Sequence, residues 1–134
     1  MQGFSKQALS FAFIGAIGFV VDGGILTLLN SAFGLSLIRA RLASFSIAIT
    51  LTWYLNRKRT FSHIKNPDAA GEWGRYAFVN SIGALLNLAI FLWLIQAYDA
   101  LAAWPILALA VAASVALVFN FLASRHVAFR PRQS

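Results

Sequence analysis

The chain has 134 residues, of which 60% are hydrophobic and only 11% charged, and its mean hydropathy is +0.73. A water-soluble domain is roughly 45–50% apolar and about 25% charged, so this composition excludes a soluble fold and indicates a protein surrounded by lipid. The absence of cysteine excludes disulfide frameworks, thiolate metal sites and thiol redox chemistry.

The first predicted element is a membrane-spanning helix over 8–30. This stretch has one charged residue, Asp22, and is longer than a signal-peptide core, so we interpret it as a retained helix. A carboxylate inside a span is costly unless it is protonated, paired or hydrated. Asp22 therefore has three interpretations: an ion pair with Arg39 or Arg41, a protonatable coupling site, or a hydrogen-bond acceptor for a substrate hydroxyl.

A second span is predicted over 38–56. Small and polar residues recur along it in steps of three or four, which places them on one helix face. This stripe comprises Arg41, Ser44, Ala48, Thr52 and Asn56. The segment that follows, from Asn56 to Phe61, reads NRKRTF, and its basic residues suit a lipid phosphate at the membrane surface.

Two further spans are predicted over 76–97 and 102–124. There are 23 uncharged residues between Arg75 and Asp99 and 25 between Asp99 and Arg125, and about 20 apolar residues are enough to cross the hydrocarbon core. The four spans leave only short loops and tails. We therefore predict one four-helix transmembrane domain over 1–134, without room for a separate catalytic domain.

The basic residues predict the orientation, since nine of the eleven Lys and Arg fall on one side of the predicted membrane. These nine are Lys6, Arg57, Lys58, Arg59, Lys65, Arg75, Arg125, Arg130 and Arg132. By the positive-inside rule this side is cytoplasmic, as are both termini. The net charge of +7 therefore requires no nucleic-acid partner, whereas Arg39 and Arg41 lie on the opposite side and call for another explanation.

The sequence also indicates an internal repeat, with copies over 11–61 and 76–129. The first and third helices align at an offset of 65, which places Asp22 on Asn87, and the segments NRKRTF and SRHVAF align at an offset of 68. Copies with two spans each share the same topology and are related by a pseudo-two-fold axis along the membrane normal. The predicted fold is an all-α membrane protein with four transmembrane helices in two repeated hairpins.

Four segments resemble the GtrA-like family: FxxIGAIGFVVDGGI in the first helix, LNRKRTF after the second, RYAFVNSIGALLN at the third and NFLASRHVAF at the fourth. The last departs from the family pattern at Ser124 and Val127. The resemblance covers essentially the whole chain. It implies a multi-pass protein of the bacterial inner membrane that flips polyprenyl-phosphate-linked monosaccharides from the cytoplasmic to the periplasmic leaflet during surface polysaccharide synthesis, next to a glycosyltransferase.

The residues and the resemblance together predict a binding path without cofactor, metal or catalytic residue. Arg57, Arg59 and Arg125 would capture the phosphate, beside Asn56, and the prenyl tail would stay among the membrane lipids. Asp22, Thr52 and Asn87 would exchange hydrogen bonds with sugar hydroxyls, and Asn120 extends the polar seam. Arg39 and Arg41 would receive the phosphate at the outer surface. Four helices enclose little space, so a homodimer or a groove open to lipid is expected.

Two other functions remain open. A non-transporting scaffold that anchors a glycosyltransferase would need the same helices but no polar path. A small multidrug-resistance-type exporter also has four helices and an acidic residue in the first, but the strong charge bias here fixes one orientation. An enzyme is not expected, since the sequence has no nucleophile and base at catalytic spacing, and His63 and His126 fit an interfacial position.

Overall fold

The computed structural model describes residues 3–64 and 66–131, and the regular structure of these residues is entirely helical, which confirms the predicted all-α class. Lys65 and Arg132, counted above among the basic residues, lie outside the described residues. The chain divides into two compact units: the first comprises the chain up to Ala69 together with Pro131, and the second runs from Ala70 to Arg130. Each unit contains one helical hairpin.

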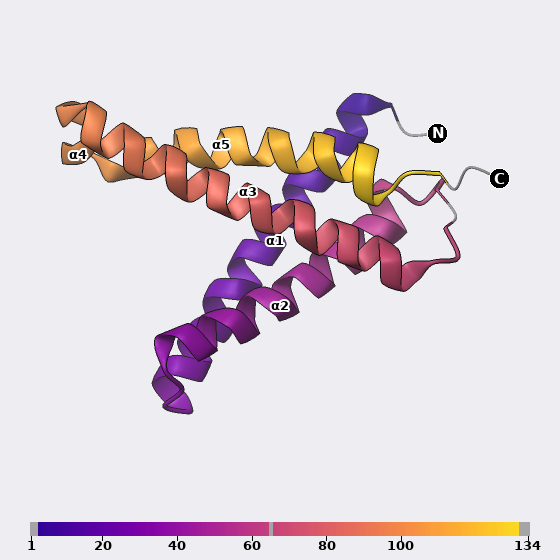
Figure 1. Ribbon diagram of the computed structural model, residues 1–134, viewed down its shortest axis with the longest axis horizontal. Coiled ribbons are helices and arrows are strands. Elements are labelled where there is room, and N and C mark those ends of the chain that lie inside the picture. Colours follow the sequence, from indigo (N-terminus) through magenta and orange to yellow (C-terminus); the bar gives the residue numbers. More distant parts are fainter. Residues whose placement is uncertain (1–2, 65, 132–134) are drawn as a thin grey trace. The chain divides into compact units, whose positions relative to one another are not determined.

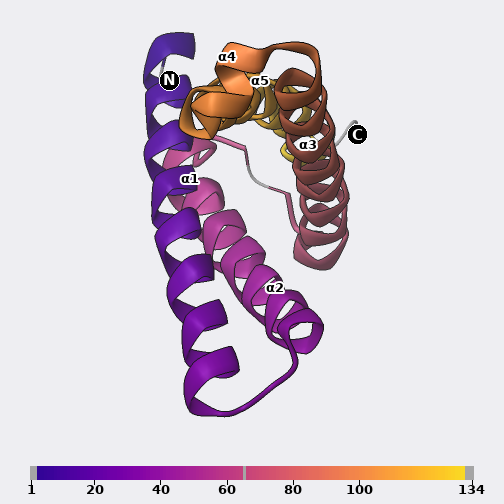
Figure 2. The same cartoon turned by 90° about the vertical axis from the view of Figure 1, so that its left-hand side faces the viewer.

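The first hairpin consists of α1 (Phe4–Thr27), which continues into the π-helical turn η1 (Leu28–Ala32), and α2 (Leu37–Leu55), which continues into η2 (Asn56–Thr60). Figure 2 shows α1 and α2 side by side and joined at one end. At this turn Gly34 adopts a φ of 66°, and the Leu35 N–H bonds back to the Leu29 carbonyl at 3.0 Å. Ser36 then caps α2 by accepting a hydrogen bond from the Arg39 N–H.

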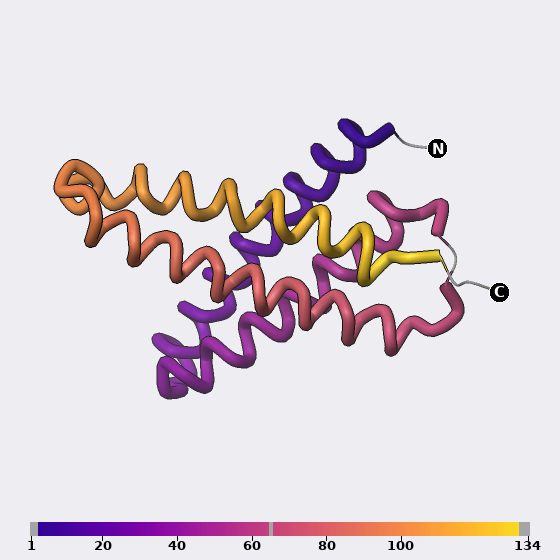
Figure 3. The backbone as a smooth tube through the Cα atoms, turned by 45° about the horizontal axis from the view of Figure 1, so that its top comes forward, coloured from indigo at the N-terminus to yellow at the C-terminus, as the bar shows by residue number. Residues whose placement is uncertain are grey.

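The second hairpin consists of α3 (Ala69–Ala97), the short α4 (Asp99–Ala103), and α5 (Pro105–Ala123) with its terminal π-helical turn η3 (Ser124–Ala128). The long helices α3 and α5 run beside each other and α4 lies at their turn (Figures 1 and 3). Pro105 begins α5 at the position where its missing N–H costs nothing.

The apolar residues of both hairpins lie mostly on the outside. Three helical stretches of the described chain are long and apolar enough to cross a membrane: Phe4–Ala32, Ala69–Ala97 and Pro105–Ala128. Within the most apolar 18 residues of each stretch, only 11% to 22% of the residues are buried. Large side chains such as Phe13 and Phe19 are 70% and 77% exposed. Lipid rather than water is the solvent that makes such a surface favourable.

The span predicted over 38–56 is not among these three stretches. The structure does form a helix there, α2, but this helix carries Arg39 and Arg41 in its first turns and hydroxyl residues along its length. Its crossing of the membrane stays a prediction at this point.

Small and polar side chains fill the space between the helices of each hairpin. In α2 every fourth residue is buried, at Ala40, Ser44, Ala48 and Thr52. In α5 the buried residues Ala108, Ala112 and Ala116 have the same spacing. These three lie 68 residues after the first three of α2. Small residues at such spacing allow two helices in lipid to approach closely. The inward faces are therefore smaller and more polar than the outward ones.

In each hairpin a glycine lies in close contact with the facing helix. A Cβ on Gly18 would collide with the Thr52 side chain, and one on Gly83 would lie 2.6 Å from the Asn120 amide carbon. Gly83 is 65 residues after Gly18, and Asn120 is 68 residues after Thr52. The two hairpins thus pack their helices at corresponding positions.

These contacts predict a paired stability experiment. Gly18→Ala should destabilise the protein by about 1–3 kcal/mol, because the new methyl group overfills the contact with Thr52. Gly15→Ala in the same helix meets nothing within 4 Å and should keep or slightly raise the stability through helix propensity, by up to about 1 kcal/mol. Thermal unfolding midpoints in one detergent would check both; equal midpoints for the two variants would contradict the close contact.

Candidate functional site

The basic end of the first hairpin is closed by a hydrogen-bond network around the turn η2. Thr60 Oγ1 donates to Asn56 Oδ1 at 2.8 Å and lies 2.7 Å from Ser10 Oγ of α1, while the Phe61 N–H bonds to the Asn56 carbonyl at 2.8 Å. Asn56 and Thr60 are buried. This network ties the end of α2 to the start of α1.

An aromatic contact completes this closure. Phe61 is fully buried and packs edge to face against Phe11, with ring centroids 6.5 Å apart. The chain therefore folds back directly after η2, which holds the three basic residues between Asn56 and Thr60 in one turn.

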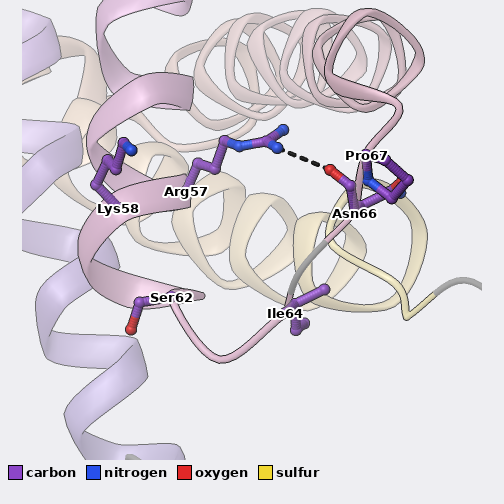
Figure 4. Close-up of a pocket in the computed structure, with 6 residues that line it drawn as sticks. All are labelled: Arg57, Lys58, Ser62, Ile64, Asn66 and Pro67. Carbon is purple, nitrogen blue, oxygen red and sulfur yellow. Dashed lines mark hydrogen bonds between the residues drawn. The ribbon is translucent and has the colours of Figure 1, made fainter.

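A pocket of about 380 Å³ opens beside this turn (Figure 4). Its lining residues are Arg57, Lys58, Ser62, Ile64, Asn66 and Pro67. The Arg57 guanidinium donates to the Asn66 carbonyl at 2.7 Å, and the Asn66 side chain accepts from the Asp68 N–H at 2.9 Å. The loop after η2 is thus held against the arginine, and the pocket has two cationic side chains.

Aromatic rings lie beneath both cations. The Arg57 guanidinium carbon is 5.6 Å from the centre of the Trp53 ring, and Lys58 Nζ is 5.8 Å from that of Tyr54, separations at which the ring faces attract the charges. Trp and Tyr concentrate where membrane meets water. The pocket therefore has the chemistry of a site for an anionic lipid headgroup: two cations and a hydroxyl group line it, and each cation lies near an aromatic ring outside the lining.

The second hairpin closes its basic end in a related way. The Phe129 N–H bonds to the Ser124 carbonyl at 2.8 Å, and Phe129 packs edge to face on Tyr76 at 5.7 Å. Where the first hairpin has the contact between Ser10 and Thr60, the second has Arg75. Its guanidinium donates to the carbonyls of Val127 and Ala128 at 3.1 and 3.4 Å. Arg75, expected only to set the topology, therefore caps η3.

Arg125 is the second residue of η3, as Arg57 is of η2, and it is partly exposed. Arg59, expected to join the phosphate-binding residues, is exposed and does not line the pocket. The structure therefore distinguishes three arginines that the sequence grouped together: one at the pocket, one outside it, and one in the other hairpin.

The polar residues predicted to form a seam have different surroundings. Thr52 is buried against Gly18, and its hydroxyl donates to the Ile49 carbonyl at 3.1 Å. In the second hairpin the Oδ1 atoms of Asn87 and Asn120 are both buried without a hydrogen-bond partner. Such acceptors inside an apolar environment are costly and favour a donor that arrives from outside.

Asp22 is paired with Arg41, whose Nη1 lies 2.9 Å from the carboxylate Oδ2. Arg39, the other expected partner, is exposed. Side chains that are two positions apart on an α-helix point in directions about 200° from each other. Only one of the two arginines can therefore face α1. Arg41 lies in α2 16 residues before Arg57, about 24 Å along the helix, so its pair with Asp22 of α1 occupies the other end of the hairpin.

Sequence reasoning missed most of the pocket. Ser62, Ile64, Asn66 and Pro67 lie in a loop, where no periodicity marks a binding residue. Lys58 was expected only as one of the basic residues of the NRKRTF segment. The Asn-Pro dipeptide at 66–67 was the one local signal of an ordered turn. Among the described residues no group of three His, Asp or Glu could hold a metal ion.

Comparison with known protein families gives a match over most of the chain. The family model described as GtrA/DPMS, transmembrane domain, matches residues 10–129. No curated protein matches the chain. The matched range includes both hairpins from the start of the first network, at Ser10, to the last aromatic contact, at Phe129.

The network around η2 predicts the effect of removing Asn56. Asn56→Ala leaves the buried Thr60 hydroxyl without its acceptor, which should cost about 1–3 kcal/mol of stability and loosen the loop that follows. Hydrogen exchange of residues 56–64 should accelerate, whereas Arg59→Ala, an exposed change in the same turn, should leave it as it is. Unchanged exchange in Asn56→Ala would show that the network does not hold the turn.

Proposed function

The chain belongs to the GtrA/DPMS transmembrane-domain family, and on that premise we propose that it carries a polyprenyl-phosphate-linked monosaccharide from the cytoplasmic to the periplasmic leaflet of the bacterial inner membrane. The observation that supports this function most is the pocket at the end of α2, with Arg57 and Lys58 above interfacial aromatic rings. A phosphate diester at the membrane surface is the ligand that this combination suits.

The proposal includes four membrane spans. In the first hairpin α2 runs back along α1, so a chain that crosses the membrane in α1 returns in α2. The segment of α2 is less apolar than the other three because it contains Arg39, Arg41 and several hydroxyl residues, but Arg41 is paired with Asp22, and Ser44 and Thr52 are buried. Both termini and the pocket then lie on the cytoplasmic side, where the basic residues concentrate.

We further propose that the two units are copies of one hairpin. The glycine contacts, the π-helical turns and the edge-to-face aromatic pairs recur at offsets of 65 in the first helix of each unit and 68 in the second. Shared composition explains similar letters, but it does not explain the same contacts at the same positions. A duplicated two-helix unit accounts for both.

Transport in this proposal needs no bond to break. Arg57 offers a planar fork of N–H donors to the phosphate, and Lys58 adds a second positive charge. The prenyl chain stays in lipid, against the exposed apolar side chains. The unpartnered acceptors of Asn87 and Asn120 would bind sugar hydroxyls during passage, in place of the water that the sugar leaves behind.

Proteoliposomes would test transport directly. Arg57→Ala should slow transbilayer movement of a polyprenyl-phosphate hexose by about ten- to a hundredfold, the loss expected for a hydrogen-bonded charge, and Arg57→Lys should fall between this variant and the wild type. Arg130→Ala removes an equal charge from an exposed position outside the pocket and should match the wild type.

Thermal midpoints of all variants would separate misfolding from loss of binding, since Arg57 also holds the Asn66 carbonyl. Wild-type vesicles that behave like empty ones would contradict transport. If the protein then still copurifies with a glycosyltransferase, the scaffold function replaces it.

The topology can be tested with single cysteines, because the chain has none of its own. Cysteine at Ser62, beside the pocket, should react with a membrane-impermeant maleimide only from the cytoplasmic side. Cysteine at Ser31, an exposed position in η1, should react only from the outside. Labelling of both positions from one side would show that α1 does not cross the membrane as proposed.

A further inference from the structure

The second hairpin provides an internal comparison for the ion pair between Asp22 and Arg41. The positions that correspond to these residues, at offsets of 65 and 68, are occupied by Asn87 and Leu109. Both charges are therefore missing from the second hairpin. Its glycine contact and its aromatic contact are nevertheless the same as in the first.

It follows that a hairpin of this design closes without an ion pair. The pair is also costly, since Asp22 is only 14% exposed within an apolar helix and its Oδ1 has no hydrogen-bond partner. An interaction that is expensive and unnecessary for packing calls for a role other than packing.

The position of Arg41 indicates what this role is. Its side chain is 55% exposed, although one of its nitrogens is 2.9 Å from the carboxylate, so a ligand can reach the guanidinium without displacing the helices. It lies about 24 Å along α2 from Arg57, which is most of the thickness of a hydrocarbon core. The hairpin therefore presents arginine side chains near both membrane surfaces, and of the two in α2 it is Arg41 that faces α1.

We propose that Arg41 is a second phosphate-binding residue, at the surface opposite the pocket, and that Asp22 is the internal anion that occupies it when no phosphate is present. This inference rests on the proposed function and adds the site where the ligand arrives. Carboxylate and phosphate compete for the same guanidinium. Asp22 keeps the arginine neutralised and in position between ligands, and by competing it also lets the phosphate leave.

The chain itself supplies the test variant. Asp22→Asn together with Arg41→Leu copies the residues of the second hairpin into the first. We expect the double variant to fold with a thermal midpoint near that of the wild type and to lose at least about tenfold in movement of a polyprenyl-phosphate hexose across proteoliposomes. A double variant that fails to fold would overturn the proposal, because the pair would then be structural, and so would one that transports normally.

A binding measurement gives a second test, because the competing explanations of Asp22 predict opposite changes in affinity when it is replaced. In an Arg57→Ala background, which removes the arginine of the pocket, Asp22→Asn should tighten the binding of a water-soluble short-chain prenyl phosphate by about tenfold, since it removes the competing anion. Arg41→Leu in the same background should weaken it. A structural pair predicts that both changes weaken binding, and a purely proton-coupled Asp22 predicts no tightening; either result would overturn the proposal.

The two experiments also separate this inference from the proposed function. Movement that depends on Arg57 but is indifferent to the double variant would overturn the second phosphate site and leave transport in place. A wild-type protein that moves no lipid, but whose probe affinity rises on Asp22→Asn, would overturn transport and leave an anion site at Arg41.

Discussion

Close packing of two helices on small side chains is the constraint on which each hairpin depends. Lipid provides no hydrophobic force between helices, so contact must come from van der Waals packing and hydrogen bonds. Gly18 lies close against Thr52, and Gly83 lies close against Asn120. At the helix contacts of α2 and α5 the buried positions spaced by four carry alanine, serine and threonine. Many of the large apolar residues face outward, as Phe13 and Phe19 do. The polar groups inside each hairpin are thus a consequence of packing on small side chains.

The two hairpins close their basic ends on the same backbone pattern. A π-helical turn widens the end of the second helix, a buried aromatic residue folds back onto the first helix, and one arginine stands second in the turn. π-helical turns are rare and occur often at functional sites. In the first hairpin the loop after the turn returns to Arg57 and encloses a pocket with it. In the second, Arg75 is used to cap the turn, so the same backbone plan has different chemistry.

Composition and charge spacing were sufficient to predict an all-helical membrane protein, and the family resemblance is confirmed by the match over 10–129. The sequence offered both Arg39 and Arg41 as partners of Asp22, and only the rotation of α2 against α1 selects Arg41. The pocket could not be predicted, because Ser62 and Asn66 reach it through loop geometry that no periodic pattern encodes. The buried Ser10–Thr60 contact was equally hidden, since two hydroxyl residues 50 positions apart carry no joint signal.

The central claim is that a lipid-linked phosphate enters at the pocket beside η2. The most direct measurement is photoaffinity mapping in vesicles, with a prenyl-phosphate hexose that carries a photoreactive group on the sugar. The account predicts that adducts concentrate in residues 57–67 and are competed away by unlabelled prenyl-phosphate hexose. Adducts spread over the lipid-facing side chains of α1, α3 and α5, and insensitive to competitor, would contradict it.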